Sequence, residues 1–492
     1  MTRIAPLFFA LAFLTACSPP SGDDSTSIDV AAQSQTIAEI EYEGGYPTAA
    51  TAAAMFDEYD FQAATQFYIW GYAYLNSLGF EKGLERLGGD QRSFYIFDQR
   101  IQPNQAVITP NDEVVYVWSR LIDLSKGPVV FEVPPRSRGH FWDLGMRAYL
   151  DVGDVGPDGG NGGNYIVYTT DFDGEIPDGF FEVQIEYSNI ISFVFRTFPA
   201  TEGSLEAAVE LGSTVRWYYL DEAGNPPVSP IVLIGDRDFS QEWPRNEEAF
   251  EWLAEAFNRD KVPESGLAHM GNMRRLGIER GTPFSPDQRA KEILKRAATT
   301  AEAMVLSMAF RNRVSEPIYD NRQFEPYANN RSPQFFQENY EEVEERAGAW
   351  HQLVGNFANY TPASPGTGQY TMTTYRDAEG NPLLGQHTYR LNVPANVPVA
   401  QFWQFPVYES ATRALINTSQ QRTSMSSTDD LTRNEDGSVN LYFSPALPDG
   451  VPESNWVQTI PDEGWFTLPR LYAPLEPILN KTWRWNDIER ID

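Results

Sequence analysis

Two blocks of short strand-like runs, separated by a long helical stretch, constrain the fold of this chain most. Between Ser93 and Phe198, and again from Gln369 to the end, β-branched and aromatic residues form short runs that are broken by Gly, Pro and Asp. Such runs are typical of antiparallel strands joined by turns. The sequence therefore predicts an α+β protein with two mainly antiparallel domains of β-sandwich or jelly-roll type, a helical N-terminal region and a helical middle segment.

Helical periodicity marks the regions before and between the two blocks. From Pro47 to Leu87, large apolar residues recur mostly at three- or four-residue spacing, and we expect a helical hairpin there. Further helices are expected at 204–220, 246–257, 285–310 and from 332 to about 353. In the segment 285–310, Ser285 is the expected N-cap and Pro286 the first helical residue.

The N-terminus has the features of a bacterial lipoprotein signal. Arg3 precedes an apolar run, Ile4 to Ala16, that is too short to cross a bilayer as a helix. The run ends in LTA directly before Cys17, which resembles a lipobox, and Cys17 is the only cysteine of the chain. No internal disulfide is possible, so we expect Cys17 to be lipidated. A plain cleaved signal peptide is the alternative.

The expected organisation follows from these segments. Residue Ser18, rather than an aspartate, follows the lipidation position, and this favours delivery to the outer membrane, on its periplasmic or surface side. The predicted parts are a signal peptide at 1–16, a flexible tether at 17–45, a helical hairpin with a β domain at 46–225, a helical linking region at 226–360 and a second β domain at 361–492.

The charge of the chain limits its partners. With 68 acidic and 37 basic residues the net charge is −31, which disfavours nucleic acid and anionic polymers such as uronate chains. The acidity has a simpler explanation as well, since it keeps an exported protein soluble. We expect contact with the membrane only through the lipid, a small-molecule or glycan ligand as the candidate partner, and homo-oligomerisation through exposed sheet edges as an open alternative.

Long motifs in both blocks resemble a known pair of domains. The segments ITPNDEVVYVWSRLIDLSKGPVVFEVPP and GPDGGNGGNYIVYTTDFDGEIPDGFF resemble the N-terminal domain of unknown function 1254. The segments YRLNVPANVPVAQFWQFPVYE, NEDGSVNLYFSP and NWVQTIPDEGWFTLPRLYAPLEPILNKTW resemble its usual companion, the domain of unknown function 1214. The resemblance implies exported bacterial proteins with two β-sandwich-like domains, and it implies no reaction. The chain departs from the family pattern at Gln404 and Glu409, where relatives usually carry Ser and Asp.

Several kinds of catalytic site lack their usual motifs. The four histidines, His140, His269, His351 and His387, are scattered and form no zinc-binding pair on one helix. The sequence has no Gly-x-Ser-x-Gly elbow, no phosphate-binding loop and no dinucleotide fingerprint. No cofactor is therefore predicted.

The first group of candidate residues lies in the segment RGHFWDLGMRAYLD, residues 138–151, whose pattern is typical of a strand. Alternation puts Arg138, His140 and Trp142 on one face, and a regular strand would put Asp143 and Arg147 on the other. Histidine and aspartate are proton donors and acceptors, and arginine binds carboxylates, so His140, Asp143 and Arg147 are candidate catalytic residues. An ordinary ion-paired sheet edge is the alternative.

The second constellation is the glycine-rich stretch DVGDVGPDGGNGGN, residues 151–164. Asp151, Asp154 and Asp158 supply oxygen ligands of the kind that calcium prefers. The spacing is not that of an EF-hand, and a plain turn is the alternative. Calcium is the only metal that the sequence suggests.

The third constellation gathers polar and aromatic residues of the kind that line a cleft for sugars or small organic acids. Its candidate ligand-binding residues are Asn111, from the TPND motif, and Trp403, Tyr408, Arg413, Asn455, Trp456, Arg470 and Tyr472. Core residues with satisfied polar tips are the alternative.

Two functional classes remain open. The first is a lipid-anchored hydrolase or lyase acting on a glycan or small organic substrate, with His140 or a tyrosine as the base and with Arg147 or Arg470 holding an anion. The second is a non-catalytic ligand-binding or scaffold lipoprotein of the cell envelope. An enzyme should bring His140, Asp143 and the C-terminal arginines into one pocket.

Overall fold

The computed structural model describes residues 40–492 except 312, 314–316, 329–331, 333, 354, 358–359 and 361. The chain divides into two units, Met1–Ala54 and Met55–Asp492. In the first unit, β1 (Tyr42–Glu43) and β2 (Tyr46–Pro47) form a short antiparallel pair before helix α1 (Ala49–Arg86) begins. Cys17 and the predicted signal peptide lie outside the described residues.

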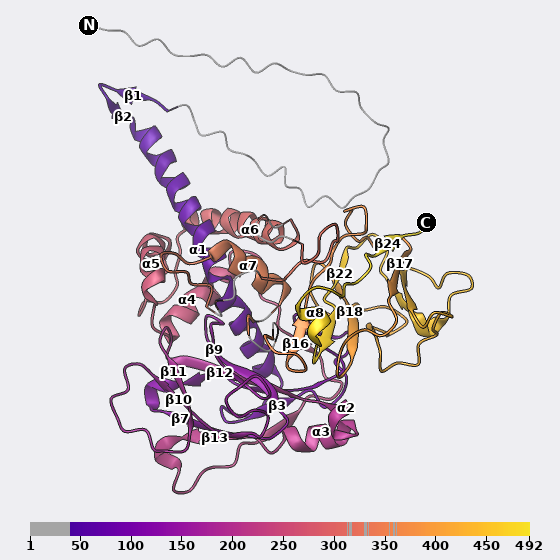
Figure 1. Ribbon diagram of the computed structural model, residues 1–492. Helices are drawn as coiled ribbons and strands as arrows, with labels where there is room; N and C mark the ends of the chain where they lie inside the picture. The colour runs from indigo at the N-terminus through magenta and orange to yellow at the C-terminus, as the bar shows by residue number, and fades with distance from the viewer. Residues whose placement is uncertain are drawn as a thin grey trace, which may run out of the picture. The chain divides into compact units, whose positions relative to one another are not determined.

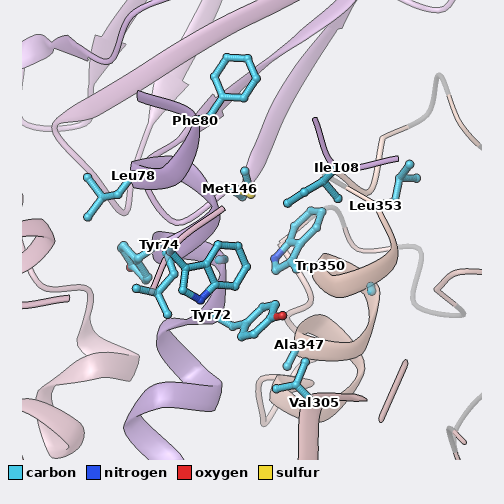
Figure 2. Packing of buried hydrophobic residues seen from close by; sticks show 14 of the residues in the cluster. Tyr72, Tyr74, Leu78, Phe80, Ile108, Met146, Val305, Ala347, Trp350 and Leu353 are labelled. Carbon is cyan, nitrogen blue, oxygen red and sulfur yellow. The ribbon is translucent and has the colours of Figure 1, made fainter. Parts of the chain in front are cut away.

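Helix α1 is a single helix of 38 residues, so the expected helical hairpin is wrong. Every residue from Phe67 to Glu81 is buried, on all sides of the helix. A helix that is apolar all round belongs in a core. Its glycines allow close packing: a Cβ added at Gly79 would collide with the carbonyl oxygen of Gln241. Figure 2 shows Tyr72, Tyr74 and Leu78 of this helix within the core.

The first β block forms two packed sheets. One sheet has the order β11-β10-β7-β13, and the other has the order β14-β3-β5-β12-β8-β9, with β6 also paired to β12. A shared core joins them, because Phe131 and Tyr165 of the first sheet pack with Phe141 and Phe193 of the second. The strands are β3 (Phe94–Ile96), β5 (Val115–Ser119), β6 (Ile122–Asp123), β7 (Val129–Val133), β8 (Arg138–Asp143), β9 (Ala148–Val152), β10 (Gly163–Thr169), β11 (Phe181–Ile185), β12 (Ile190–Thr197), β13 (Arg216–Tyr219) and β14 (Ile231–Leu233).

The second block also forms two sheets around one core. The sheet orders are β16-β23-β18-β19, with β22 paired to β18, and β21-β20-β17-β24. Their inner side chains, such as Phe405 and Leu441, share one hydrophobic cluster. Figure 1 shows β17, β18, β22 and β24 gathered in the orange and yellow part of the chain. The strands are β16 (Gln369–Thr371), β17 (Tyr389–Val393), β18 (Trp403–Glu409), β19 (Ser424–Ser426), β20 (Val439–Ser444), β21 (Trp456–Gln458), β22 (Trp465–Thr467), β23 (Arg470–Tyr472) and β24 (Glu489–Arg490).

The remaining elements are helices and one small sheet. Together with the β blocks they confirm the predicted α+β class. A short parallel pair joins β4 (Gln105–Ala106) and β15 (Phe239–Ser240). The helices besides α1 are α2 (Pro199–Glu202), α3 (Leu205–Gly212), α4 (Ala249–Arg259), α5 (Leu267–Met273), α6 (Gln288–Phe310), α7 (Val343–Gln352) and α8 (Glu476–Leu479). Within the described part of the chain, no helix combines the length and apolarity that crossing a membrane requires.

Three helix boundaries differ from expectation. The predicted helix at 204–220 stops at Gly212, because the following residues join the sheet as β13. Helix α6 begins later than expected: Asp287, not Ser285, is the N-cap, and its carboxylate accepts a hydrogen bond of 2.7 Å from the Ala290 N–H. The helix expected from residue 332 begins only at Val343.

A buried carboxylate at the end of α4 connects this helix to β12. The Asp260 carboxylate accepts hydrogen bonds from the Ser188 hydroxyl and from the backbone N–H of Asn189 at 2.7 Å. Burial raises the pKa of Asp260 to about 6, although these hydrogen bonds oppose the rise. In the unfolded chain an aspartate titrates near pH ~3.9. Between these two values the unfolded chain loses the proton more readily, so the contribution of Asp260 to stability falls as pH rises.

We therefore expect Asp260→Asn to remove one component of the pH dependence of folding. From pH ~4 to pH ~7, the wild-type protein should lose roughly 2 kcal/mol more unfolding free energy than the variant does. Urea unfolding of both proteins at the two pH values measures this difference. Parallel stability profiles would contradict the assignment.

Candidate functional site

Three neighbouring strands, β5, β12 and β8, carry the first half of the candidate site. In their register Tyr116 lies opposite Arg196, and Arg196 lies opposite Arg138. His140 comes two residues after Arg138 and shares its face of the sheet, because side chains alternate along a strand. Phe141, the residue after His140, packs on the other face in the sandwich core. The predicted alternation of this motif is thus confirmed as far as residue 142, whose ring lies 5.1 Å from that of His140.

The TPND motif connects this face to the C-terminal sheets. The Arg470 guanidinium donates hydrogen bonds to the Thr109 carbonyl at 2.5 Å and to the Tyr408 hydroxyl at 3.1 Å. The Tyr408 hydroxyl in turn donates to the Pro110 carbonyl at 2.6 Å. One residue further, the Asn111 side chain donates to the Tyr472 hydroxyl at 2.5 Å. Residues 109–111 are therefore held by strands β18 and β23.

A small cavity lies between the two sets of residues. Its volume is about 20 Å³, which by general experience with buried water admits little more than one water-sized group. Its polar wall is formed by Thr109, Tyr116, His140, Arg196, Tyr360 and Arg470. The remainder of the lining is largely apolar and includes Ile108 and Leu353, both labelled in Figure 2. The cavity therefore draws on both predicted domains and on the segment between them.

His140 is neutral in this setting. Its ring stacks on Phe357 with 3.3 Å between the centroids, and neither ring nitrogen has a hydrogen-bond partner among the described residues. Burial holds the pKa of His140 well below its usual range, and the charge of Arg196 adds to this effect. At neutral pH the imidazole is therefore available as a hydrogen-bond acceptor or a base.

Three tyrosines at the site, Tyr360, Tyr408 and Tyr472, stay protonated. Burial raises the pKa of Tyr360 to about 12, although the nearby Arg196 opposes the rise. Burial also raises the pKa of Tyr408 and of Tyr472. These hydroxyls are neutral donors at physiological pH. Among the described residues that line the cavity, Arg196 and Arg470 are the only charged ones.

The two guanidiniums lack the counterions that other buried arginines have. Arginine side chains with less than 2% exposure are Arg147, Arg196, Arg346, Arg413 and Arg470. Among them, Arg147 pairs with Asp143 at 3.5 Å, Arg413 pairs with Glu242 at 2.7 Å, and Arg346 pairs with Glu341. Arg196 and Arg470 have no carboxylate within 4.0 Å in the described part of the chain.

Each of the two arginines also keeps an unused donor. Arg196 donates from Nη1 to the Gln369 side chain at 3.1 Å, while its Nη2 has no partner among the described residues. Arg470 uses Nη2, and its Nε has no such partner. A buried charge without a counterion costs several kcal/mol. The two positive charges therefore lack a negative partner, and a bound anion would supply it.

Asp143 and Arg147 belong to a different cluster. The backbone turns after β8, with Met146 at φ 57°, so residues 138–151 form a hairpin rather than the regular strand that was expected. Asp143 accepts a hydrogen bond of 3.0 Å from the Tyr149 hydroxyl, and Arg147 donates to the Tyr74 hydroxyl at 3.2 Å. The pair does not line the cavity, and its charges balance each other.

The predicted C-terminal residues divide into two groups. One group surrounds the cavity or supports it and consists of Asn111, Tyr408, Arg470 and Tyr472. The others have local roles: Trp403 packs in the second core, Arg413 pairs with Glu242, Asn455 donates to the Thr432 and Asn440 carbonyls, and Trp456 donates to Ser444. The structure thus brings together about half of this set.

The glycine-rich loop uses its acids to bind protein groups. Asp154 forms two hydrogen bonds with the Arg138 guanidinium, at 2.9 and 2.7 Å. Asp158 accepts from the backbone N–H groups of Gly153 and Gly162 at 2.7 and 2.9 Å. Across the described residues, no group of three or more His, Cys, Asp or Glu side chains is arranged to hold a metal ion.

Sequence reasoning missed Arg196 and Tyr360. Arg196 is the only charged residue of the strand IISFVFRT, in which every residue is buried. A lone cation in such a run is a usable signal, because a buried charge requires a partner. Tyr360 carries no comparable signal, since it reaches the site through tertiary packing, with the Arg196 guanidinium 5.3 Å from its ring centre.

Comparisons with known proteins confirm the two predicted domains. Residues 92–219 match the family described as protein of unknown function DUF1254, and residues 368–476 match protein of unknown function DUF1214, in the predicted order. No curated protein matches the chain. Arg196 lies in the first region and Arg470 in the second, so the cavity is built from both matched domains.

One solved structure shows a similar fold, and a second is a weaker match. The crystal structure of the VPA0106 protein from Vibrio parahaemolyticus has a TM-score of 0.52 and 16% sequence identity, over 88% of this chain and 100% of that chain. A crystal structure of an uncharacterised protein from Burkholderia cenocepacia has a TM-score of 0.37 and 12% identity, over 90% of this chain and 97% of that chain. The first likeness concerns the fold alone.

The difference between paired and unpaired arginines predicts opposite responses to the same substitution. Arg147→Met leaves Asp143 buried without its cation and should lower the unfolding free energy by about 3 kcal/mol. Arg196→Met abandons no carboxylate and removes a costly buried charge, so its unfolding free energy should stay within about 1 kcal/mol of the wild type. Urea unfolding at low salt measures both. Equal destabilisation by the two substitutions would contradict the charge analysis.

Proposed function

We propose that this protein is a lipid-anchored protein of the bacterial cell envelope that binds a small anion in the cavity between Arg196 and Arg470. The observation that carries the proposal is the pair of buried guanidiniums, which face one cavity and have no carboxylate within ion-pairing distance among the described residues. An anion there would supply the missing charge, and guanidinium N–H groups are well suited to bind one.

The cavity favours a small ligand over a glycan. A space of about 20 Å³ is far smaller than the cavities that hold drug-sized molecules, which occupy roughly 300 Å³ or more. The tyrosine hydroxyls and the neutral His140 would add hydrogen bonds without adding competing negative charge. A role in binding, without catalysis, therefore explains the site most simply.

The bound anion is tested by what the purified protein carries. After dialysis against a buffer without small anions, wild-type protein is denatured and the released anions are quantified by ion chromatography. We expect about one equivalent per chain from the wild type and none from the double variant Arg196→Met, Arg470→Met. Arg136→Met serves as the control, because Arg136 is an exposed arginine that pairs with Glu202 and does not line the cavity. No released anion, together with no rise in melting temperature on adding small anions, would refute the proposal.

An enzymatic role is the second candidate, as a hydrolase or lyase of a small organic substrate. It is favoured by His140, whose two ring nitrogens have no partner among the described residues and whose pKa is held low by burial. A neutral imidazole beside a bound anion is placed as a general base would be. An enzyme of this kind would hold its substrate through the same two guanidiniums. The anion-binding experiment therefore tests the enzymatic role as well.

The envelope location rests on the N-terminal sequence alone. Cys17 follows an apolar run of signal-peptide length, and the acidic chain carries no other cysteine. Expressed from its full sequence in a Gram-negative host, wild-type protein should incorporate labelled palmitate and sediment with outer membranes. Cys17→Ser should incorporate none and should no longer sediment with them. Equal incorporation by both proteins would contradict lipidation at Cys17.

A further inference from the structure

We infer that the anion in this cavity is a single chloride ion, held by Thr109 and Tyr116 as well as by the two guanidiniums. This inference rests on the anion-binding function proposed above, names its ligand and adds two binding residues. It follows from the size of the space, from the number of donors that meet there and from the backbone of Thr109.

The size of the cavity decides the kind of anion. Its volume of about 20 Å³ admits little more than one water-sized group. Formate, the smallest carboxylate, already has a carbon and two oxygens, and nitrate, sulfate and phosphate are larger still. Chloride is a single atom that is only slightly larger than a water molecule. Fluoride is smaller, but it holds its hydration shell more tightly and loses more on entering a mostly apolar space. Among the common anions, chloride therefore fits best.

More donors meet at the cavity than a water molecule can accept from. Arg196 Nη2 and Arg470 Nε have no partner among the described residues. The Tyr116 hydroxyl accepts from the Asn111 backbone N–H at 3.1 Å, so its own O–H remains available to donate. With the Thr109 hydroxyl, the lining supplies two guanidinium nitrogens and two hydroxyls. A water oxygen has only two lone pairs and no net charge, whereas a spherical anion accepts from several directions and offsets part of the positive charge.

Thr109 lines the cavity and is held in an unfavourable backbone conformation. Its φ is 40°, a region that β-branched residues rarely adopt. Its backbone is fixed on both sides, because its N–H donates to the Arg413 carbonyl at 2.8 Å and its carbonyl accepts from Arg470. Its hydroxyl is buried and has no partner among the described residues. Strained residues gather at binding sites, where the surroundings hold them in place. A chloride that accepts from this hydroxyl accounts for both features.

The apolar part of the lining also suits a single-atom anion. It consists of Val107, Ile108, Trp118, Val194 and Leu353, each at most 5% exposed. An oxyanion carries oxygens in several directions, and those that face hydrocarbon would lack a hydrogen bond, which is costly. Chloride has no such separate acceptor atoms. Donors on one side of it are therefore enough.

The identity of the retained anion tests the inference. The full chain is purified in detergent, in a buffer that holds equal concentrations of sodium chloride, formate, nitrate and sulfate. The protein is then desalted and denatured, and the released anions are quantified by ion chromatography. The proposed function expects the bound anion to survive the removal of free salt. We therefore expect about one chloride per chain and about a tenth of that amount, or less, of each other anion.

Substitutions at Thr109 test its hydroxyl. Thr109→Val keeps the shape of the side chain but removes the hydroxyl, whereas Thr109→Ser keeps the hydroxyl. Loss of one hydrogen bond to a charged group weakens binding about tenfold or more. Radioactive chloride, loaded into folded protein by prolonged incubation, should therefore leave Thr109→Val about tenfold faster than the wild type. It should leave Thr109→Ser, and the exposed control Arg136→Met, at nearly the wild-type rate. If Thr109→Val does not fold, Tyr116→Phe takes its place with the same expected result.

The outcomes distinguish this inference from the function on which it rests. Retention of formate, nitrate or sulfate in place of chloride, lost in the double variant Arg196→Met, Arg470→Met, would uphold the anion site and overturn chloride as its ligand. Equal release rates from Thr109→Val, Tyr116→Phe and the wild type would overturn the two added binding residues. No anion released from the wild type, together with no rise in melting temperature on adding any of these salts, would overturn both the inference and the function.

Discussion

The short segment Thr109–Asp112 is the contact on which the arrangement of the site depends. It belongs to the first β block, yet its polar groups bind to the second block. The Thr109 and Pro110 carbonyls accept from Arg470 and Tyr408, and the Asp112 carboxylate accepts from Gln404 and Thr423. These groups are buried, so each hydrogen bond that is lost leaves an unsatisfied partner. The cavity exists only when both blocks are folded and joined here.

Gln404 connects strand β18 to the TPND segment. Gln404 lies opposite Arg470 in the pairing of β18 with β23, and its amide reaches Asp112. A serine at this position would have a shorter side chain with a single hydroxyl. The substitution therefore changes how the TPND segment is held, next to the arginine that faces the cavity.

The sequence was informative where local rules decide structure and uninformative where tertiary packing decides it. Strand texture predicted the two β blocks, because alternating burial imposes a period of two on each strand. The same strand pattern failed after Asp143, where the chain turns back into β9 with Met146 at φ 57°. In α1, the expected hairpin is a single helix, and its glycines allow close packing, as Gly79 does against Gln241.

The candidate site shows the same limit. Arg470 and Tyr472 were predictable as polar residues in a strand, and His140 was predictable from its motif. Their convergence was not, because it requires knowing that residues 109–111 cross to the other block. Asp143 and Arg147 were grouped with His140 by sequence proximity, yet the hairpin carries them into a self-neutralising pair. Distance along the chain was a poor guide to which charges meet.

The negative charge of the whole protein bears on how an anion reaches this site. With a net charge of −31, the surface repels anions at long range, and salt screens that repulsion over about 10 Å. The two guanidiniums act at short range and inside a low-dielectric interior, where screening is weak. Added inert salt should therefore speed the entry of the anion while changing its interaction with Arg196 and Arg470 little. On the proposed function, the surface would repel most anions, and the two guanidiniums would hold the one that enters.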